Sequence, residues 1–198
     1  GIAAEQLLNG TYGSYLLLAI PLFILAATFM STGSIMDRLL RFCNAIVGRF
    51  RGGLAHVNVV QSIIFASMSG SALADAASSG KLMQSLMTRD GKYPPAYAAA
   101  LTTVSSVIGP ILPPSIPLVL YALVSDASVG YLFMAGVIPG LLLGAVQSGL
   151  IAVTARRRKF PVEERVPLSA LPRVTWEALP ALLMPVILLG CLYSGVTT

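Results

Sequence analysis

Two clusters of small, hydroxyl-bearing and helix-breaking residues are the features of this sequence best suited to binding chemistry. The first is Ser69-Gly70-Ser71, and the second contains Gly109, Pro110, Pro113, Pro114 and Ser115. Each proline lacks a backbone donor and disfavours helix in the residue before it, so carbonyl groups lose their helical partners in the second cluster. Carbonyl and hydroxyl oxygens suit a hard cation such as sodium, and half-helix N-termini favour anions. For the first cluster, a tight helix-packing face made of small residues is an equally open interpretation.

Few titratable side chains lie within the apolar stretches. Asp75 is the only carboxylate between Asp37 and Asp90. An ionisable residue inside a membrane is a functional candidate, so Asp75 is a weaker candidate for ion binding, with a contact to backbone or water as the alternative. His56 is the single histidine, which argues against a His-based metal site, and a polar contact with a neighbouring helix is its simplest role.

An intramembrane serine hydrolase is a competing hypothesis. Ser69 or Ser71 would be the nucleophile and His56 its base, within hydrogen-bond reach. The sequence has no G-x-S-x-G nucleophile motif. If the intervening segment is helical, His56 lies roughly 20 Å from the serines. A passive channel is a second alternative, and it would conduct without a sodium gradient.

The elements that carry these residues are membrane segments. The chain has 198 residues, of which 56% are hydrophobic and only 11% charged, against about 25% charged in soluble domains. Four stretches are free of charge and as long as the roughly 20 residues that cross a bilayer. They are residues 6–36, 93–125, 127–155 and 178–198. The net charge of +5 comes from short basic clusters between these stretches, which indicates membrane orientation rather than a nucleic-acid ligand. Cys43 and Cys191 have neither metal-ligand spacing nor a disulfide framework.

The order of the segments predicts an all-α integral membrane protein. We expect a transmembrane helix over Ser14–Met36, then a basic segment that is either an interfacial helix or a charged loop. Residues 53–80 form two short arms around the Ser-Gly-Ser elbow, which predicts a re-entrant hairpin. Residues 93–125 predict two half-helices joined by unwound backbone. Further spans are expected from Gly130 to Ala155 and from Trp176 to Tyr193.

The basic clusters predict the orientation. Residues 38–51, 81–92 and 156–173 carry most of the Lys and Arg and should all be cytoplasmic. A single crossing by residues 53–80 would place the first two clusters on opposite faces, whereas a re-entrant hairpin keeps both inside. The chain opens with Gly1 and stops directly after an apolar segment, so we expect a piece of a longer protein.

The ordered motifs resemble a known family. SGSALADAASSGK lies at Ser69–Lys81, GPILPPS at Gly109–Ser115, and AGVIPG at Ala135–Gly140. Together with AIPLFILAA at Ala19–Ala27, this set resembles the large membrane subunit of tripartite ATP-independent periplasmic (TRAP) transporters. The resemblance covers most of the chain from Leu18 to Gly144.

The resemblance implies a sodium-driven importer of organic acid anions, such as C4-dicarboxylates, in the bacterial inner membrane. Its expected partners are a small TRAP membrane subunit, a periplasmic substrate-binding protein, the lipid bilayer and the anion itself. No cofactor or metal is implied besides the coupling sodium ion. The family's fold is an elevator-type transporter with two inverted repeats, of which this chain would hold one.

The resemblance also implies a division of the chain and of the site. Residues 1–52 would be scaffold, residues 53–126 the transport-domain hairpin and broken helix, and residues 127–198 further spans with a basic linker. The hairpin tip would face the helix break. The two clusters would then supply carbonyl and hydroxyl ligands to sodium and part of the substrate chamber.

Overall fold

All regular structure in the described part of the chain is helical. The computed structural model describes residues 21–22, 24–25, 28–29, 34–163, 167 and 170–194, so 14 of the 23 residues of the span predicted over Ser14–Met36 lie outside the described residues. The helices are α3 (Ser34–Val47), α4 (Gly53–Ser69), α5 (Ala72–Asp75), the π-helix η1 (Ala76–Gly80), α6 (Lys81–Thr88), the short 3₁₀ helix η2 (Arg89–Gly91), α7 (Pro95–Ser106), α8 (Ile116–Ser125), α9 (Val129–Arg158) and α10 (Leu171–Tyr193). The all-α class predicted from the sequence is confirmed for these ranges.

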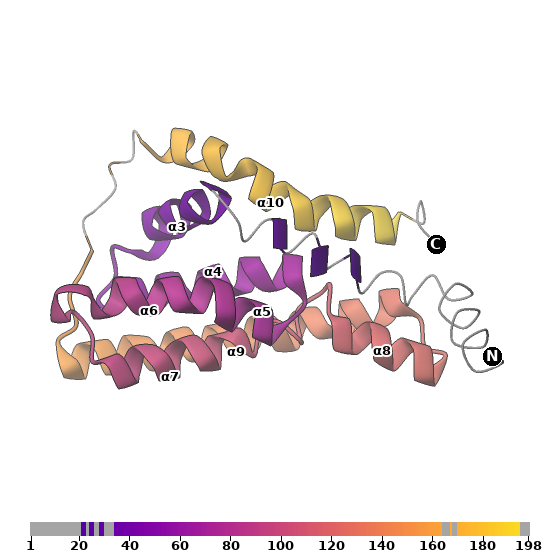
Figure 1. Ribbon diagram of the computed structural model, residues 1–198, viewed down its shortest axis with the longest axis horizontal. Helices are drawn as coiled ribbons and strands as arrows, with labels where there is room; N and C mark the ends of the chain where they lie inside the picture. Colours follow the sequence, from indigo (N-terminus) through magenta and orange to yellow (C-terminus); the bar gives the residue numbers. More distant parts are fainter. Residues whose placement is uncertain are drawn as a thin grey trace, which may run out of the picture.

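The helices lie in three layers (Figure 1). Helices α3 and α10 pack together on one side, α4 and α6 form the middle, and α7 and α9 lie on the opposite side. Helix α4 contacts α3, α7 and α9, so it is the central helix of the bundle. Helix α8 continues beyond α7 and packs against α9.

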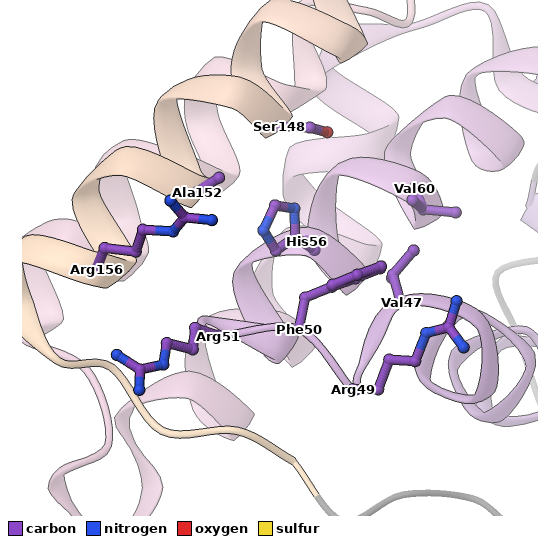
Figure 2. A pocket seen from close by; sticks show the side chains of 9 residues that line it. All are labelled: Val47, Arg49, Phe50, Arg51, His56, Val60, Ser148, Ala152 and Arg156. Atoms are coloured by element: carbon purple, nitrogen blue, oxygen red, sulfur yellow. The ribbon is translucent and has the colours of Figure 1, made fainter.

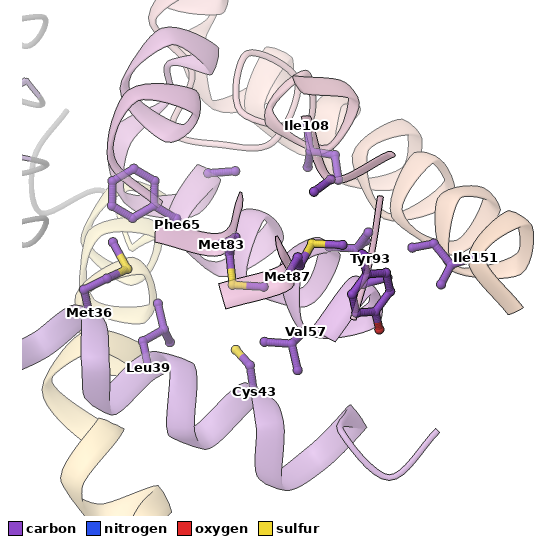
Figure 3. Packing of buried hydrophobic residues seen from close by; sticks show 14 of the residues in the cluster. Met36, Leu39, Cys43, Val57, Phe65, Met83, Met87, Tyr93, Ile108 and Ile151 are labelled. Atoms are coloured by element: carbon purple, nitrogen blue, oxygen red, sulfur yellow. The ribbon is translucent and has the colours of Figure 1, made fainter. Parts of the chain in front are cut away.

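The basic segment after residue 36 is a helix rather than a charged loop. In α3, Met36, Leu39 and Cys43 are buried at helical spacing, while Asp37 and Arg41 are exposed. The buried side chains of α3 point toward Val57, Phe65 and two methionines of the hairpin arms (Figure 3). The amphipathic pattern is therefore explained by packing against α4, and its position at a membrane interface stays a prediction.

Residues 53–88 form a helical hairpin. Its first arm, α4, lies between Gly52 and Gly70, which both have left-handed backbone (φ 77° and 60°), a conformation that glycine adopts at little cost. The second arm is α5, η1 and α6 in succession, and α4 contacts all three. At 1.5 Å per residue, each 17-residue arm is about 25 Å long, which is short of the roughly 30 Å hydrocarbon core.

The predicted end of the second arm, at Gly80, is wrong by about two turns. The arm continues through Thr88 because Met83 and Met87 are spaced to bury one face, while Lys81 and Ser85 take the exposed face. A basic residue at an exposed helix position does not end a helix, so the charge at Lys81 was misleading.

The predicted break between two half-helices is confirmed, and the later predicted spans are helices. Helix α7 ends at Ser106 and α8 begins at Ile116, with turns and extended backbone between them. By length and composition, α9 and residues 171–191 of α10 could each cross a membrane. Helix α9 exposes a long apolar surface that includes Ile138, Leu142 and Leu150. Helix α10 begins at Leu171, five residues before the predicted start.

Small residues at every fourth position of α9 allow the rest of the protein to approach it. A methyl group at Gly136 would overlap the carbonyl oxygen of Ile111. At Gly140 it would lie 2.6 Å from the Leu112 side chain, and at Gly144 2.6 Å from that of Ile63. Residues 111 and 112 belong to the α7–α8 break, so the glycines of α9 hold the unwound segment in place.

The three basic regions meet at one end of the molecule. The Gly52 amide donates to the Pro161 carbonyl oxygen at 3.0 Å, which joins the α3–α4 loop to the segment after α9. The Lys92 ammonium pairs with the Glu163 carboxylate at 3.0 Å, which joins the α6–α7 loop to the same segment. The ends of the hairpin arms therefore lie on the same side as the end of α9, opposite the hairpin tip.

Candidate ion and substrate site at the hairpin tip

The hairpin tip is a tight turn built by Ser69, Gly70 and Ser71. The Gly70 amide donates to the Ala66 carbonyl oxygen at 3.0 Å and closes α4. Ser71 has extended backbone, and its hydroxyl accepts from the Ala74 amide at 3.4 Å, so it caps the N-terminus of the second arm. The Ser69 hydroxyl accepts from the Ser71 amide at 3.4 Å. Both serine hydroxyls thus organise the turn itself.

The break between α7 and α8 uses its serine in the same way. Ser115 is fully buried, and its hydroxyl donates to the Pro110 carbonyl oxygen at 2.5 Å. The Ser115 hydroxyl oxygen also accepts from the Leu118 amide at 3.3 Å, so Ser115 caps α8. Pro110 therefore enters the site through its carbonyl group, and Pro113 lies in the loop between them.

The structure brings the tip and the break into direct contact. The Gly70 carbonyl oxygen accepts from the Ile116 amide at 3.4 Å, and a methyl group at Gly70 would overlap the Pro114 carbonyl oxygen. A methyl group at Gly109 would lie 3.1 Å from the Ser71 carbonyl carbon. Two glycines, one on each side, permit this approach.

The junction collects backbone groups of both polarities. The second hairpin arm and α8 both begin there, so two helix N-termini lie close to the carbonyl groups of the tip and the break. A cavity of about 390 Å³ lies beside it, and its lining includes Ser69, Ser71, Ala74, Ser78 and Ile116. That volume is within the range of small-ligand sites.

Asp75 lies one turn beyond the tip and is buried. Its Oδ1 accepts a short hydrogen bond from the Ser79 hydroxyl, and its Oδ2 has no hydrogen-bond partner within the described residues. Asp75 is not among the residues that line the cavity. Its geometry therefore places it behind the site rather than in it.

A buried polar network that fastens the hairpin to α7 was missed in the sequence analysis. The Asn58 side-chain amide donates to the Ser105 hydroxyl at 2.7 Å, and the Ser62 hydroxyl lies 3.2 Å from the same oxygen. The Gln84 side-chain amide donates to the Thr102 hydroxyl at 2.8 Å from the second arm. The available signal was the four-residue spacing of Asn58 and Ser62 within a largely apolar run.

The geometry does not support the serine hydrolase. His56 lies near the start of α4 and the tip serines at its end, so 13 residues of helix, about 20 Å, separate them. His56 instead lines a different cavity, at the opposite end of the hairpin.

A helical hairpin packed on a broken helix, beside helices able to cross a bilayer, is the architecture of secondary transporters. The chain belongs to the family described as the tripartite ATP-independent periplasmic transporter, DctM component, which it matches over residues 1–198. This is a transporter family, which also counts against the enzyme hypothesis.

Several curated relatives are similar over nearly the whole chain. A C4-dicarboxylate TRAP transporter large permease protein of Pseudomonas aeruginosa is 45% identical over 93% of this chain and 43% of its own length. A sialic acid TRAP transporter large permease protein of Vibrio cholerae is 40% identical over 98% of this chain and 45% of its own length. A 2,3-diketo-L-gulonate TRAP transporter large permease protein of Escherichia coli is 37% identical over 100% of this chain and 46% of its own length. The chain spans less than half the length of these relatives.

Proposed function

We propose that this chain is the first-repeat part of a sodium-coupled permease that imports an organic acid anion across the bacterial inner membrane. A periplasmic binding protein delivers the anion, and a small TRAP membrane subunit completes the membrane complex. The family assignment supports a transport role, and the names of the relatives share acids or acid anions as substrates. A C4-dicarboxylate or a similar carboxylate is the proposed substrate class.

The contact between the hairpin tip and the helix break is the observation that carries this proposal. Sodium needs several oxygen ligands, and this junction gathers backbone carbonyl groups and serine hydroxyls in a buried place. The proposed ligands of sodium and substrate are Ser69, Gly70, Ser71, Gly109, Pro110, Pro113, Pro114 and Ser115. Asp75 is a weaker candidate, because its carboxylate faces Ser79 rather than the cavity.

The re-entrant orientation of the hairpin is part of the proposal. The three basic regions gather at one end of the molecule through the Gly52–Pro161 and Lys92–Glu163 contacts. If that end is cytoplasmic, the hairpin enters from the inside and returns, and the tip lies at membrane depth. Unwound backbone at that depth is tolerated where it lines a cavity, which fits a transport site.

Uptake against sodium concentration tests the proposed ligands. The assay uses vesicles that contain the full-length permease, its small subunit and its binding protein. Ser71→Ala removes a hydroxyl and is expected to raise the sodium concentration for half-maximal uptake severalfold. Ser71→Thr keeps a hydroxyl and an N-cap, so it should stay near wild type.

Loss of the cap alone costs about 1 kcal/mol of stability, so expression and thermal stability are measured on both variants. An unchanged sodium dependence in a well-folded Ser71→Ala permease would remove the Ser71 hydroxyl from the ion site. Uptake that proceeds without any sodium gradient would refute the coupling itself.

A further inference from the structure

A second cavity lies at the end of the molecule opposite the hairpin tip. Its volume is about 730 Å³, within the range of small-ligand sites. The loop between α3 and α4, the first turns of α4 and the last turns of α9 form its walls. Figure 2 shows the side chains of Arg49, Arg51 and Arg156 around it, with His56 between Phe50 and α9.

Three guanidinium groups around one cavity favour an anion. Arg49, Arg51 and Arg156 are exposed, and in the part of the chain that the structure describes none of them forms an ion pair. Glu163, an acidic residue of the adjoining segment, is engaged by Lys92. Arginine presents several donors in a planar fork that suits phosphate oxygens. The charge of the cavity is therefore available to a ligand.

The remaining walls are apolar. Val47 and Val60 line the cavity together with Phe50, whose ring lies 6.1 Å from the His56 ring, edge to face. A soluble anion would leave these surfaces unused. A ligand with a charged head and hydrocarbon chains would cover both kinds of wall.

Helix α9 connects this cavity to the surface of the bundle. Small residues recur at every fourth position of α9, and other parts of the protein pack on this series as far as Gly144, which contacts Ile63. The next two members, Ser148 and Ala152, line the cavity instead, and Arg156 follows one turn later. On the same side of α9, three to four turns before Ala152, the helix exposes Ile138 and Leu141. A hydrocarbon chain can follow this apolar face while the head group stays at the arginines.

We propose that this cavity binds the phosphate head group of an anionic phospholipid, with the acyl chains lying along the outer face of α9. The occupant is a lipid because positive charge, apolar walls and an exposed apolar helix face meet at one place. Basic pockets between membrane helices are suited to anionic head groups. The site is separate from the hairpin tip and does not depend on the sodium proposal.

The test measures lipid retention by the full-length permease with its small subunit. The complex is reconstituted in vesicles of phosphatidylcholine with increasing phosphatidylglycerol, extracted gently and analysed by native mass spectrometry. One phosphatidylglycerol is expected to be retained in preference to phosphatidylcholine. Arg51→Gln with Arg156→Gln should raise the phosphatidylglycerol content needed for half occupation about 25-fold, from roughly fivefold for each arginine.

A matched control removes the same charge outside the cavity. Arg41→Gln with Arg157→Gln changes two exposed arginines on α3 and α9 that do not line the cavity, and lipid retention should be unchanged. Ala152→Leu narrows the cavity without altering charge and should also weaken retention. This variant keeps the proposal testable if the double arginine variant does not fold.

Three results would overturn the proposal. Equal loss in the control would show a diffuse surface charge effect rather than a site. Displacement of the lipid by inorganic phosphate, with chloride at matched ionic strength as the reference, would identify a soluble anion as the ligand. An absence of any preference for phosphatidylglycerol in the wild-type complex would show that another part of the protein fills the cavity.

Discussion

The contact between the hairpin tip and the helix break can be tested by adding one methyl group. Gly70→Ala places a side chain on a left-handed residue, which costs about 1–2 kcal/mol. The new methyl group would also overlap the Pro114 carbonyl oxygen. Backbone cannot move aside as a flexible side chain can, so overpacking adds roughly 1–3 kcal/mol. The total expected destabilisation is about 2–5 kcal/mol.

Gly91→Ala is the matched control for this change. Gly91 has nearly the same φ (66° against 60°), but nothing lies within 4 Å of its added methyl group. It therefore pays only the conformational cost of about 1–2 kcal/mol. The difference between the two variants isolates the close approach of the tip to the break.

The assay is thermal or denaturant unfolding of the full-length permease in one detergent, with uptake measured on the same preparations. Gly70→Ala should unfold at a clearly lower midpoint than Gly91→Ala and should lose uptake. If the two variants lose equal stability, then Pro114 does not lie against Gly70, and the packing described for the site is wrong.

Two further predictions follow from the packing of α9 and from the basic end of the molecule. Gly140→Ala should destabilise the permease by about 1–3 kcal/mol, because Leu112 packs on that glycine. Gly149→Ala has nothing within 4 Å of its new methyl group, so it should be neutral or stabilising by up to about 1 kcal/mol. Equal effects of the two variants in thermal unfolding would contradict this prediction. In a Cys191→Ser background, Arg51→Cys and Arg89→Cys should each resist an impermeant maleimide added outside cells, whereas Asp126→Cys should react with it. Labelling of only one of the two arginine positions would exclude the re-entrant hairpin. Cys43 can stay in place in this experiment, because it is inaccessible and burial raises the pKa of its thiol to about 12.

The elements were predictable where the signal was local. The hairpin turn follows from Ser69-Gly70-Ser71 between two apolar arms, and the α7–α8 break follows from three prolines in five residues. The extent of the second arm was not predicted, because the charge at Lys81 suggested a loop. The decisive pattern was the spacing of Met83 and Met87, which bury the opposite face.

The site was predictable in composition but not in its hydrogen bonding. Both capping serines were visible in the sequence, since Ser71 precedes a run of small helix-forming residues and Ser115 precedes a helix with proline in its first turn. Their residue types suggested ion ligands or, for Ser71, a packing face or a nucleophile, and not helix caps. The bond from Ile116 to Gly70 joins residues 46 positions apart, and neither residue type signals it.

These caps change what the serine variants are expected to do. The hydroxyl oxygens of Ser71 and Ser115 each accept a hydrogen bond from a backbone amide, so each oxygen has one lone pair left for a cation. The Gly70 carbonyl oxygen has only a long bond from Ile116, at 3.4 Å, and is the acceptor at the junction best able to take a second partner. On the sodium proposal, the hydroxyl variants should therefore weaken ion binding only in part. A shift of the Gly70 carbonyl group should abolish ion binding, because the contact between the tip and the break fixes the position of this carbonyl.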